Sequence, residues 1–272
     1  SDTFAARRAE PWREALRKSK KNKERTDIPR VEMNELDAEY RSHTRLEEVN
    51  LGLTKEQAMQ EAQRCLDCPN PTCMQGCPVS INIPAFIKEV KEGNFAEAYK
   101  VIGQSSALPA VCGRVCPQET QCEGKCIRGI KGEAVSIGKL ERFVADWAKE
   151  NGIKPVPAAE KNGHKIAVIG SGPAGLTVAG DLAKMDFDVT IFEAQSEPGG
   201  VLLFGIPEFR LQKDVVRREI SELQHIGVEI RTKQLAGVDF TVDDLFAQGY
   251  DAIFMGTGTS LPRTLDIPGK EL

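Results

Sequence analysis

The chain lacks several features that would assign a function at once. Its formal net charge is -4, so it offers no basic field for nucleic acid. No apolar run approaches the roughly 18 residues that a membrane-spanning helix needs. Its 3 histidines, His43, His164 and His225, are scattered along the chain, and neither a Ser-His-Asp nor a Cys-His arrangement is indicated. This composition predicts a soluble, cytoplasmic protein whose chemistry does not depend on histidine.

Cysteine is absent from the second half of the chain, and the 8 cysteines present fall in two tight groups. The first group reads C-x2-C-x4-C-x3-C and the second reads C-x3-C-x5-C-x3-C; the members are Cys65, Cys68, Cys73 and Cys77, then Cys112, Cys116, Cys122 and Cys126. Thiolates are soft ligands, and several of them within a short run can enclose an iron–sulfur cluster. The spacing therefore predicts iron–sulfur clusters, at first sight one in each group.

Two other interpretations of the cysteines stay open. A disulfide framework is typical of short secreted chains, whereas this chain has 272 residues and no N-terminal apolar stretch of signal-peptide type. Structural zinc is the second, because C-x2-C begins many zinc sites. Zinc sites usually combine two separate C-x2-C segments, whereas here each short segment contains four cysteines. Iron–sulfur clusters fit the spacing better than either alternative.

The pattern along the chain predicts an α+β multidomain protein. Residues 1–53 are polar with few apolar anchors, so we expect an arm, with a short helix at 11–20, that lies on another domain or on a partner. Residues 54–150 are expected to form an all-α domain, and residues 151–163, with two prolines and two glycines, a linker. The helices expected in the all-α domain begin at Thr54, which forms a capping box with Gln57, and cover 83–92, 95–102 and 136–150.

A βαβ unit follows the linker, with strands expected at 164–169 and 188–192 around a helix at 173–184. The first turn reads G-x-G-x-x-G and comprises Gly170, Ser171, Gly172, Pro173, Ala174 and Gly175. Gly170 allows the tight turn, Gly172 lets the backbone approach a pyrophosphate, and Gly175 lets helix and strand pack closely. Glu193, at the end of the second strand, is positioned to accept a hydrogen bond from a ribose hydroxyl. Together these features predict a dinucleotide site.

Two later glycine segments bear on which dinucleotide binds. Glu193 opens an E-x-x-x-x-x-G-G run, which includes Ala194, Gly199 and Gly200 and is followed by Val201. This run resembles the FAD site of flavoproteins with two dinucleotide-binding domains. A strand expected at 251–255 leads into Gly256, Thr257 and Gly258, which resemble a second FAD-contacting turn of the same superfamily. The resemblance implies FAD, held by a partial Rossmann-like α/β domain over residues 164–272.

Five motifs in order resemble one family, the small (beta) subunits of bacterial NADPH-dependent glutamate synthase, over about residues 30–272. The motifs are CLDCPNPTCMQGCP, LPAVCGRVCPQETQCEGKC, AVSIGKLERF, AVIGSGPAGL and GGVLLFGIPEFRLQKDVVRREI. The same set is similar to the large subunit of NADH-dependent ferredoxin:NADP oxidoreductase and to the N-terminal half of dihydropyrimidine dehydrogenase. Five ordered motifs are more specific than any one of them.

The resemblance implies that two 4Fe-4S clusters draw their ligands from both cysteine groups. The first would be held by Cys65, Cys68, Cys73 and Cys126, and the second by Cys77, Cys116, Cys122 and Glu141. Glu141 then replaces a fourth thiolate, which would give the second cluster an atypical potential. Cys112 is left over, and we expect a small buried residue near a cluster. The alternative keeps Cys112 as a ligand and Glu141 as an ordinary solvated acid.

The family also implies a role for Arg210 near the flavin phosphates or a neighbouring cofactor, although a surface arginine fits the spacing equally well. The relatives continue into a second nucleotide-binding domain for NAD(P)H, and no second G-x-G-x-x-G is present in this chain. We therefore expect a fragment of a longer protein, inactive by itself.

The implied function is an NAD(P)H-dependent oxidoreductase subunit of a hetero-oligomer. Electrons would pass from NAD(P)H through FAD and the two clusters to a partner oxidoreductase subunit, as in glutamate synthase, which makes glutamate from glutamine and 2-oxoglutarate. The partner would be the glutamate synthase large subunit or a ferredoxin-linked flavoprotein. Two hypotheses of other classes remain: a non-catalytic iron–sulfur docking module and a zinc-stapled structural domain.

Overall fold

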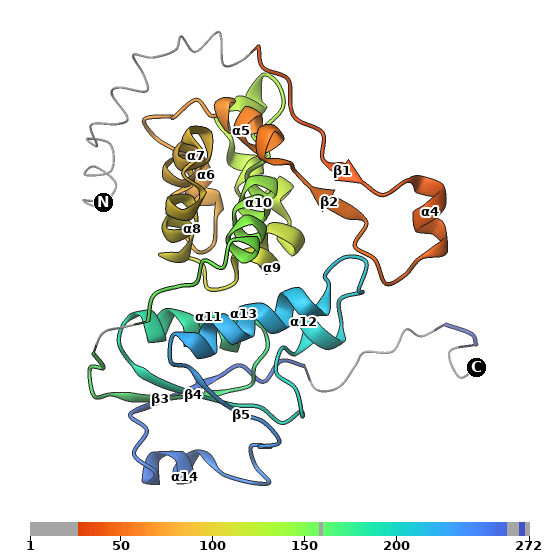
Figure 1. Cartoon of the computed structure of the whole chain (residues 1–272). Helices are drawn as coiled ribbons and strands as arrows, with labels where there is room; N and C mark the ends of the chain where they lie inside the picture. Colours follow the sequence, from red (N-terminus) through yellow and green to blue (C-terminus); the bar gives the residue numbers. More distant parts are fainter. Residues whose placement is uncertain (1–26, 158–159, 260–266, 270–272) are drawn as a thin grey trace. The chain divides into compact units, whose positions relative to one another are not determined.

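The computed structural model describes residues 27–157, 160–259 and 267–269 (Figure 1). Contacts divide the chain into two units, the first made of residues 1–156 and 206–222 and the second of residues 157–205 and 223–272. Residues 206–222, which the sequence analysis placed in the nucleotide-binding domain, thus group with the first unit. The helix expected at 11–20 lies outside the described residues.

In its described residues, the first unit is helical apart from a small antiparallel pair of strands in the arm, β1 (Asn34–Glu35) and β2 (Asn50–Gly52). The α-helices of residues 38–150 are α4 (Ala38–His43), α5 (Lys55–Gln63), α6 (Thr72–Gly76), α7 (Ile83–Glu92), α8 (Phe95–Gly103), α9 (Pro109–Val115) and α10 (Ile137–Glu150). Three short 3-10 helices follow α9: η1 (Gln118–Thr120), η2 (Glu123–Lys125) and η3 (Ile127–Ile130). Of the second cysteine group, Cys112 lies in α9, Cys116 follows it, and Cys122 and Cys126 flank η2.

Local sequence signals account for the helix ends of this unit. The predicted capping box is present, because Thr54 and Gln57 each bond the backbone of the other at the start of α5. Helix α7 has a proline in its first turn and ends at Gly93, whose φ of 81° is the left-handed cap conformation. Asn82 occupies the cap position of α7, but its side chain makes no capping hydrogen bond. Helix α10 begins after Ser136, as expected.

Helix α10 is the centre of the first unit and packs against α5, α7, α8 and α9 (Figure 1). Its apolar face includes Leu140 and Val144, both fully buried, which lie in one core with residues of the other helices. Phe143 adds an edge-to-face contact with Phe95 of α8, with ring centroids 5.1 Å apart. The core therefore fixes α10 and the helices that carry or border the cysteine loops.

Residues 28–31 of the arm lie on the helical domain of their own unit. Val31 is buried in the helical core, and Arg30 pairs with Glu123 at 2.7 Å between Nη2 and Oε2. The backbone carbonyl of Ile28 accepts hydrogen bonds from two arginines of the cysteine loops. Residues 28–31 therefore pack on the helical domain, and the role of the rest of the arm stays a prediction.

The second unit is built on a parallel four-stranded sheet in the order β5-β4-β3-β6 (Figure 1). Its strands are β3 (Lys165–Ile169), β4 (Asp188–Phe192), β5 (Glu229–Arg231) and β6 (Ala252–Met255). Its helices are α11 (Pro173–Lys184), α12 (Val201–Phe204) and α14 (Val242–Ala247), and α13 (Lys213–His225) runs from residues of the first unit into the second. Because all four strands are parallel, their carboxyl ends meet at one edge, where open α/β sheets bind ligands.

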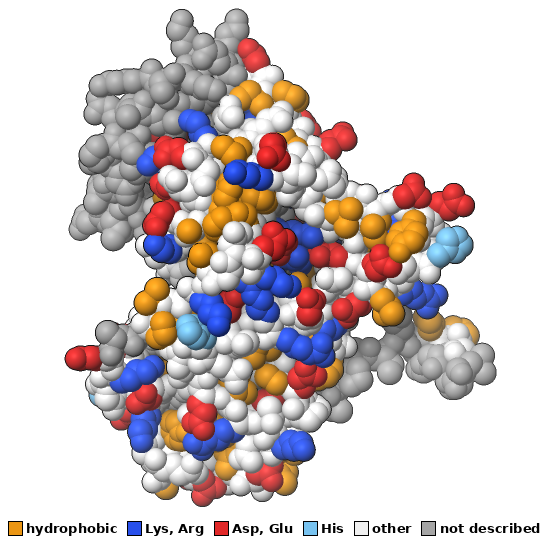
Figure 2. All heavy atoms as spheres, in the orientation of Figure 1, with side chains coloured by type: hydrophobic (Ala, Val, Ile, Leu, Met, Phe, Trp, Pro, Cys, Tyr) orange, Lys and Arg blue, Asp and Glu red, His pale blue; other side chains and the backbone are white. Residues whose placement is uncertain are grey.

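The predicted βαβ unit is present within one residue at each end. The β3 register pairs Ile169 with Phe192 of β4 and with Met255 of β6, so the loops that follow these three strands leave the sheet side by side. The face of the described residues drawn in Figure 2 carries acidic and basic side chains interspersed. In the described part of the chain, no helix is both long and apolar enough to cross a membrane.

Candidate iron–sulfur and nucleotide sites

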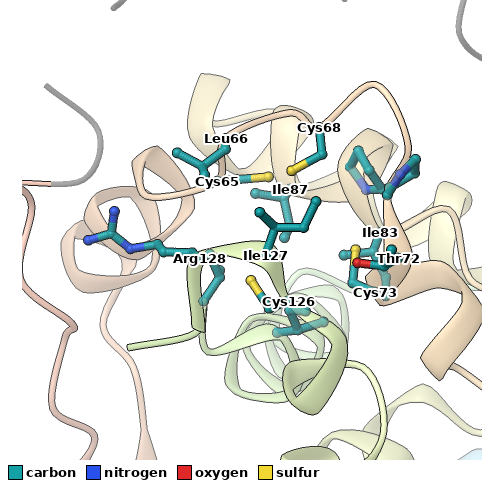
Figure 3. Close-up of a pocket in the computed structure, with 14 residues that line it drawn as sticks. Cys65, Leu66, Cys68, Thr72, Cys73, Ile83, Ile87, Cys126, Ile127 and Arg128 are labelled. Atoms are coloured by element: carbon teal, nitrogen blue, oxygen red, sulfur yellow. The ribbon is translucent and has the colours of Figure 1, made fainter. Parts of the chain in front are cut away.

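Four cysteines from both sequence groups line one cavity in the first unit. Cys65 and Cys68 follow α5, Cys73 lies in α6, and Cys126 joins η2 to η3. Figure 3 shows their sulfur atoms turned toward the same space, with Ile83, Ile87 and other apolar residues around it. The structure thus brings together the four residues that the resemblance implied for the first cluster.

Close backbone packing explains how Cys126 reaches the first cysteine group. Thr72 donates from Oγ1 to the carbonyl oxygen of Lys125 at 2.5 Å, which ties the start of α6, just before Cys73, to the end of η2, just before Cys126. At Gly76 a Cβ atom would lie 2.5 Å from the carbonyl oxygen of Gln121, so only glycine permits this approach. The glycine in the C-M-Q-G-C motif is therefore a packing requirement between the two loops.

A buried ion pair anchors the end of α5, two residues before Cys65. Arg64 Nη1 lies 2.5 Å from Glu61 Oε1, and both side chains are essentially fully buried. Arg64 also donates to three carbonyls, and Glu61 also accepts from two backbone amides; these partners are Ile28, Glu133 and Ala134 for Arg64, and Val31 and Ser136 for Glu61. Such a pair is costly to break from one side. Sequence reasoning missed it, since charges three residues apart on a helix usually face solvent.

The charges and burial around the cysteines of the first cavity favour a cationic group bound to their thiolates. We call these cysteines the first set: Cys65, Cys68, Cys73 and Cys126. Burial raises the pKa of Cys65 to about 12, and the neighbouring Cys68 and Cys126 add to that rise. Burial, followed by the charges of Cys65, Cys126 and Cys68, also raises the pKa of Cys73 well above its ordinary value. Four ionised thiolates in this space would repel one another unless iron balanced their charge.

Among the described residues, no three cysteine, histidine or acidic side chains are grouped closely enough to hold a single metal ion.

A second set forms around Glu141 on α10. Burial raises the pKa of Cys122 to about 12, with further contributions from Glu123, Glu141 and Cys77. Burial likewise raises the pKa of Cys77, while Glu141 adds to the rise and backbone amides that follow Cys77 oppose it. The Cys116 charge is in turn one cause of the raised pKa of Glu141. These charge interactions indicate that Cys77, Cys116 and Cys122 all lie near the Glu141 carboxylate.

Glu141 is a buried carboxylate with an unsatisfied oxygen. Its side chain is 7 % exposed and its Oε1 atom has no hydrogen-bond partner. Burial, then the charges of Cys116 and Glu219, hold its pKa well above the ordinary value. An orphaned buried carboxylate oxygen is rare in proteins and points to a missing ligand, such as a metal. The alternative that Glu141 is an ordinary solvated acid is wrong, because the residue is buried.

Cys112 lies beside the second set and not beside the first. It is half-buried and its pKa is raised chiefly by a side-chain hydrogen bond with Cys116, then by burial and the charge of Glu141. The same hydrogen bond lowers the pKa of Cys116 to about 7. Cys112 therefore contacts an expected ligand of the second cluster and is a neighbour of its expected carboxylate.

Glu219 is a buried acid that sequence reasoning missed. It lies on α13, is 4 % exposed, and accepts the amide of Ala110 at 2.8 Å with Oε1, while its Oε2 has no partner. Burial raises its pKa to about 8. Glu219 follows Val215 by four residues and Val216 by three, so it lies on the apolar face of α13. This spacing in the sequence could have predicted a buried acid.

Three glycine segments meet at the carboxyl edge of the sheet in the second unit. Gly170 has a φ of 98°, and a Cβ there would lie 2.5 Å from the carbonyl oxygen of Gly256. A Cβ at Gly175 would lie 1.9 Å from the carbonyl oxygen of Gly170, and a Cβ at Gly200 would lie 2.8 Å from the Cα of Gly172. Gly172 itself faces open space, which leaves its backbone accessible to a ligand.

The other predicted nucleotide residues of the second unit flank these glycine segments along the chain. Pro173 and Ala174 open α11, Ala194 is exposed after β4, Val201 opens α12, and Thr257 and Gly258 follow β6. Arg210 is exposed and belongs to a segment that groups with the first unit. The glycine loops and Glu193 are thus the predicted nucleotide residues that lie in the second unit.

Glu193 is buried and already partly bonded. Its Oε2 accepts from both the amide and the hydroxyl of Ser171, with the amide at 2.9 Å, and its Oε1 accepts from the amide of Gln195 at 2.8 Å. The Ser171 hydroxyl in turn accepts from the amide of Gly199 at 3.0 Å. The acid predicted to meet ribose is therefore held between two of the glycine loops.

Fold and sites together define an iron–sulfur domain joined to a Rossmann-like nucleotide-binding domain. Residues 41–153 match the family described as dihydropyrimidine dehydrogenase domain II, 4Fe-4S cluster, and residues 168–204 match the NAD(P)-binding Rossmann-like domain. The first domain carries the cysteines and the second carries the glycine loop.

The curated relatives confirm the resemblance predicted from the sequence. The chain is 42% identical to the glutamate synthase [NADPH] small chain of Escherichia coli (strain K12), over 75% of this chain and 43% of the relative. It is 39% identical to the corresponding small chain of Halomonas elongata, over 80% of this chain and 46% of the relative. It is 36% identical to the NAD-dependent dihydropyrimidine dehydrogenase subunit PreT of Escherichia coli (strain K12), over 80% of this chain and 53% of the relative. The chain thus spans about half the length of these relatives.

Proposed function

We propose that this chain carries the two 4Fe-4S clusters and the FAD of an NAD(P)H-dependent electron-transfer subunit. The first cluster is held by Cys65, Cys68, Cys73 and Cys126. The second cluster is held by Cys77, Cys116, Cys122 and Glu141. The observation that carries the proposal is the cavity in which Cys126 joins three cysteines of the other sequence group. One cluster in each group would not require that convergence.

Several residues of the chain would support the two cluster sites. Buried apolar side chains such as Ile83 and Ile87 line part of the first cavity, and the Arg64–Glu61 pair holds the end of α5 in place. At the second site, backbone amides after Cys77 are directed to its sulfur, which would stabilise the thiolate form. The unpartnered Oε1 of Glu141 supplies the ligand that the second cluster lacks among cysteines.

The second unit would bind FAD at the carboxyl edge of its sheet. The N-terminus of α11 offers free backbone amides to a pyrophosphate, and Gly172 leaves the approach open. Glu193 would accept a hydrogen bond from the adenosine ribose. When bound, FAD accepts a hydride and releases electrons singly, which suits a neighbour that carries one electron at a time. The polypeptide would supply the position and the surroundings of the cofactor, and no side chain would need to transfer a proton.

In the whole protein we propose that electrons pass from NAD(P)H to a partner oxidoreductase subunit. The named relatives include glutamate synthase small chains, which favours the glutamate synthase large subunit as that partner. A ferredoxin-linked flavoprotein is the alternative partner.

The test is composition and spectroscopy of anaerobically purified protein. We expect about eight irons per chain, the sum of two four-iron clusters, and two electron paramagnetic resonance signals after reduction. We also expect extractable FAD. Iron without FAD would support a docking module instead, and colourless protein with stoichiometric zinc would support a zinc-stapled domain.

A further inference from the structure

Ser171 occupies the second position of the glycine motif and is fully buried. Its amide and its hydroxyl both donate to Oε2 of Glu193, the amide at 2.9 Å. Its hydroxyl oxygen accepts from the amide of Gly199 at 3.0 Å. One small side chain therefore joins the loop after β3, the acid after β4 and the double-glycine loop.

These contacts leave Glu193 with little freedom. Its own amide donates to the carbonyl of Arg231 and its carbonyl accepts from the amide of Gln234, both at 2.9 Å. Its side chain accepts two bonds at Oε2 and one, from Gln195, at Oε1. A carboxylate offers about four lone-pair sites, so one acceptor site, on Oε1, remains open. The open acceptor site on Oε1 is therefore fixed in position, because the carboxylate cannot turn without breaking these hydrogen bonds.

We propose that Ser171 is a positioning residue for the nucleotide site, which fixes the Glu193 carboxylate so that its one open acceptor site meets a hydroxyl of the adenosine ribose. The inference rests on the proposed nucleotide site. A fixed, charged acceptor favours a ribose hydroxyl and disfavours a 2′-phosphate, which brings negative charge and no donor. Ser171 therefore sets both the affinity of the site and its preference for an unphosphorylated ribose.

The alanine variant Ser171→Ala removes two contacts and adds none. Glu193 loses the hydroxyl that restrains Oε2, and the buried amide of Gly199 loses its acceptor. We expect the Kd for ADP-ribose to rise about tenfold, in line with the loss of a hydrogen bond to a charged group. The ratio of the Kd for 2′-phospho-ADP-ribose to the Kd for ADP-ribose should fall, because a released carboxylate can turn away from the phosphate. Ser196→Ala, an exposed serine three residues after Glu193, is the matched control and should leave both values unchanged.

A double-mutant cycle by isothermal titration calorimetry separates positioning from general damage. Once Glu193→Ala has removed the acceptor, adding Ser171→Ala should cost less than about twofold further in Kd. A full tenfold loss on the Glu193→Ala background would overturn the proposal, as would wild-type affinity or an unchanged phosphate ratio in Ser171→Ala. If Ser171→Ala does not fold, as judged by its melting temperature, the isosteric pair Ser171→Thr and Ser171→Val gives the same comparison. Equal binding by that pair would also overturn it.

Titration with FAD beside ADP-ribose distinguishes this inference from the flavin proposal. If the wild-type chain binds ADP-ribose but not FAD, the flavin proposal fails while the role of Ser171 is still decided by ADP-ribose. If the chain binds neither nucleotide, both proposals fail.

Discussion

Replacement of Glu141 by alanine should remove one iron–sulfur cluster and leave the other. Glu141 is 7 % exposed and its Oε1 has no hydrogen-bond partner, so alanine deletes a buried oxygen that is free to act as a ligand. We expect the iron content to fall from about eight to about four per chain and one of two paramagnetic resonance signals to disappear. The exposed Glu150 at the end of the same helix provides the control, since Glu150→Ala should keep both signals.

The conservative variant Glu141→Gln gives a magnitude as well as a direction. Glutamine keeps an oxygen donor but removes one negative charge from the cluster's surroundings. For two charges about 4 Å apart at an effective dielectric constant of about 20, the interaction is about 4 kcal/mol, or roughly 170 mV for one electron. The midpoint potential of the second cluster should therefore rise by an amount of this order in a potentiometric titration, while that of the first stays constant. An unchanged spectrum in Glu141→Ala, or the same shift in both clusters, would refute the ligand assignment.

Three further predictions concern the other sites. Cys126→Ala should lose the first cluster and about four irons, because its sulfur faces the shared cavity, whereas Cys112→Ala should keep both clusters; iron analysis that shows the reverse would restore Cys112 as a ligand. Gly175→Ala should weaken nucleotide binding and lower the free energy of unfolding by roughly 1–3 kcal/mol, because its Cβ would lie 1.9 Å from the carbonyl oxygen of Gly170; full iron content would show that the damage is local. Glu219→Gln should stabilise the protein more at about pH 8.5 than at about pH 6 in denaturant titrations. Its folded pKa of about 8 lies above the ordinary 4.5, so the wild type loses stability as the pH rises between these values; an equal gain at both pH values would contradict a raised pKa.

Sequence reasoning succeeded where the cause of a structure is local. The capping box at Thr54, the left-handed cap at Gly93 and the helix after Gly172 each depend on residues within about one turn. The glycine motif also belongs to this class, because a tight turn between a strand and a helix specifies its own geometry. Asn82 shows the limit, since it stands at the cap position but makes no capping bond.

The sequence by itself determined that cysteines crowd into two groups and that a βαβ unit carries a glycine turn followed by an acid. Only the tertiary structure decided which of these residues face one another. Cys126 lines the cavity of the first group because Gly76 lets two loops approach within backbone contact, and Glu141 is buried because α10 lies at the centre of its unit. Ser171 likewise meets Glu193 only because β3 and β4 are paired in register. Such contacts depend on how distant segments pack, and residue spacing along the chain carries no direct record of that packing.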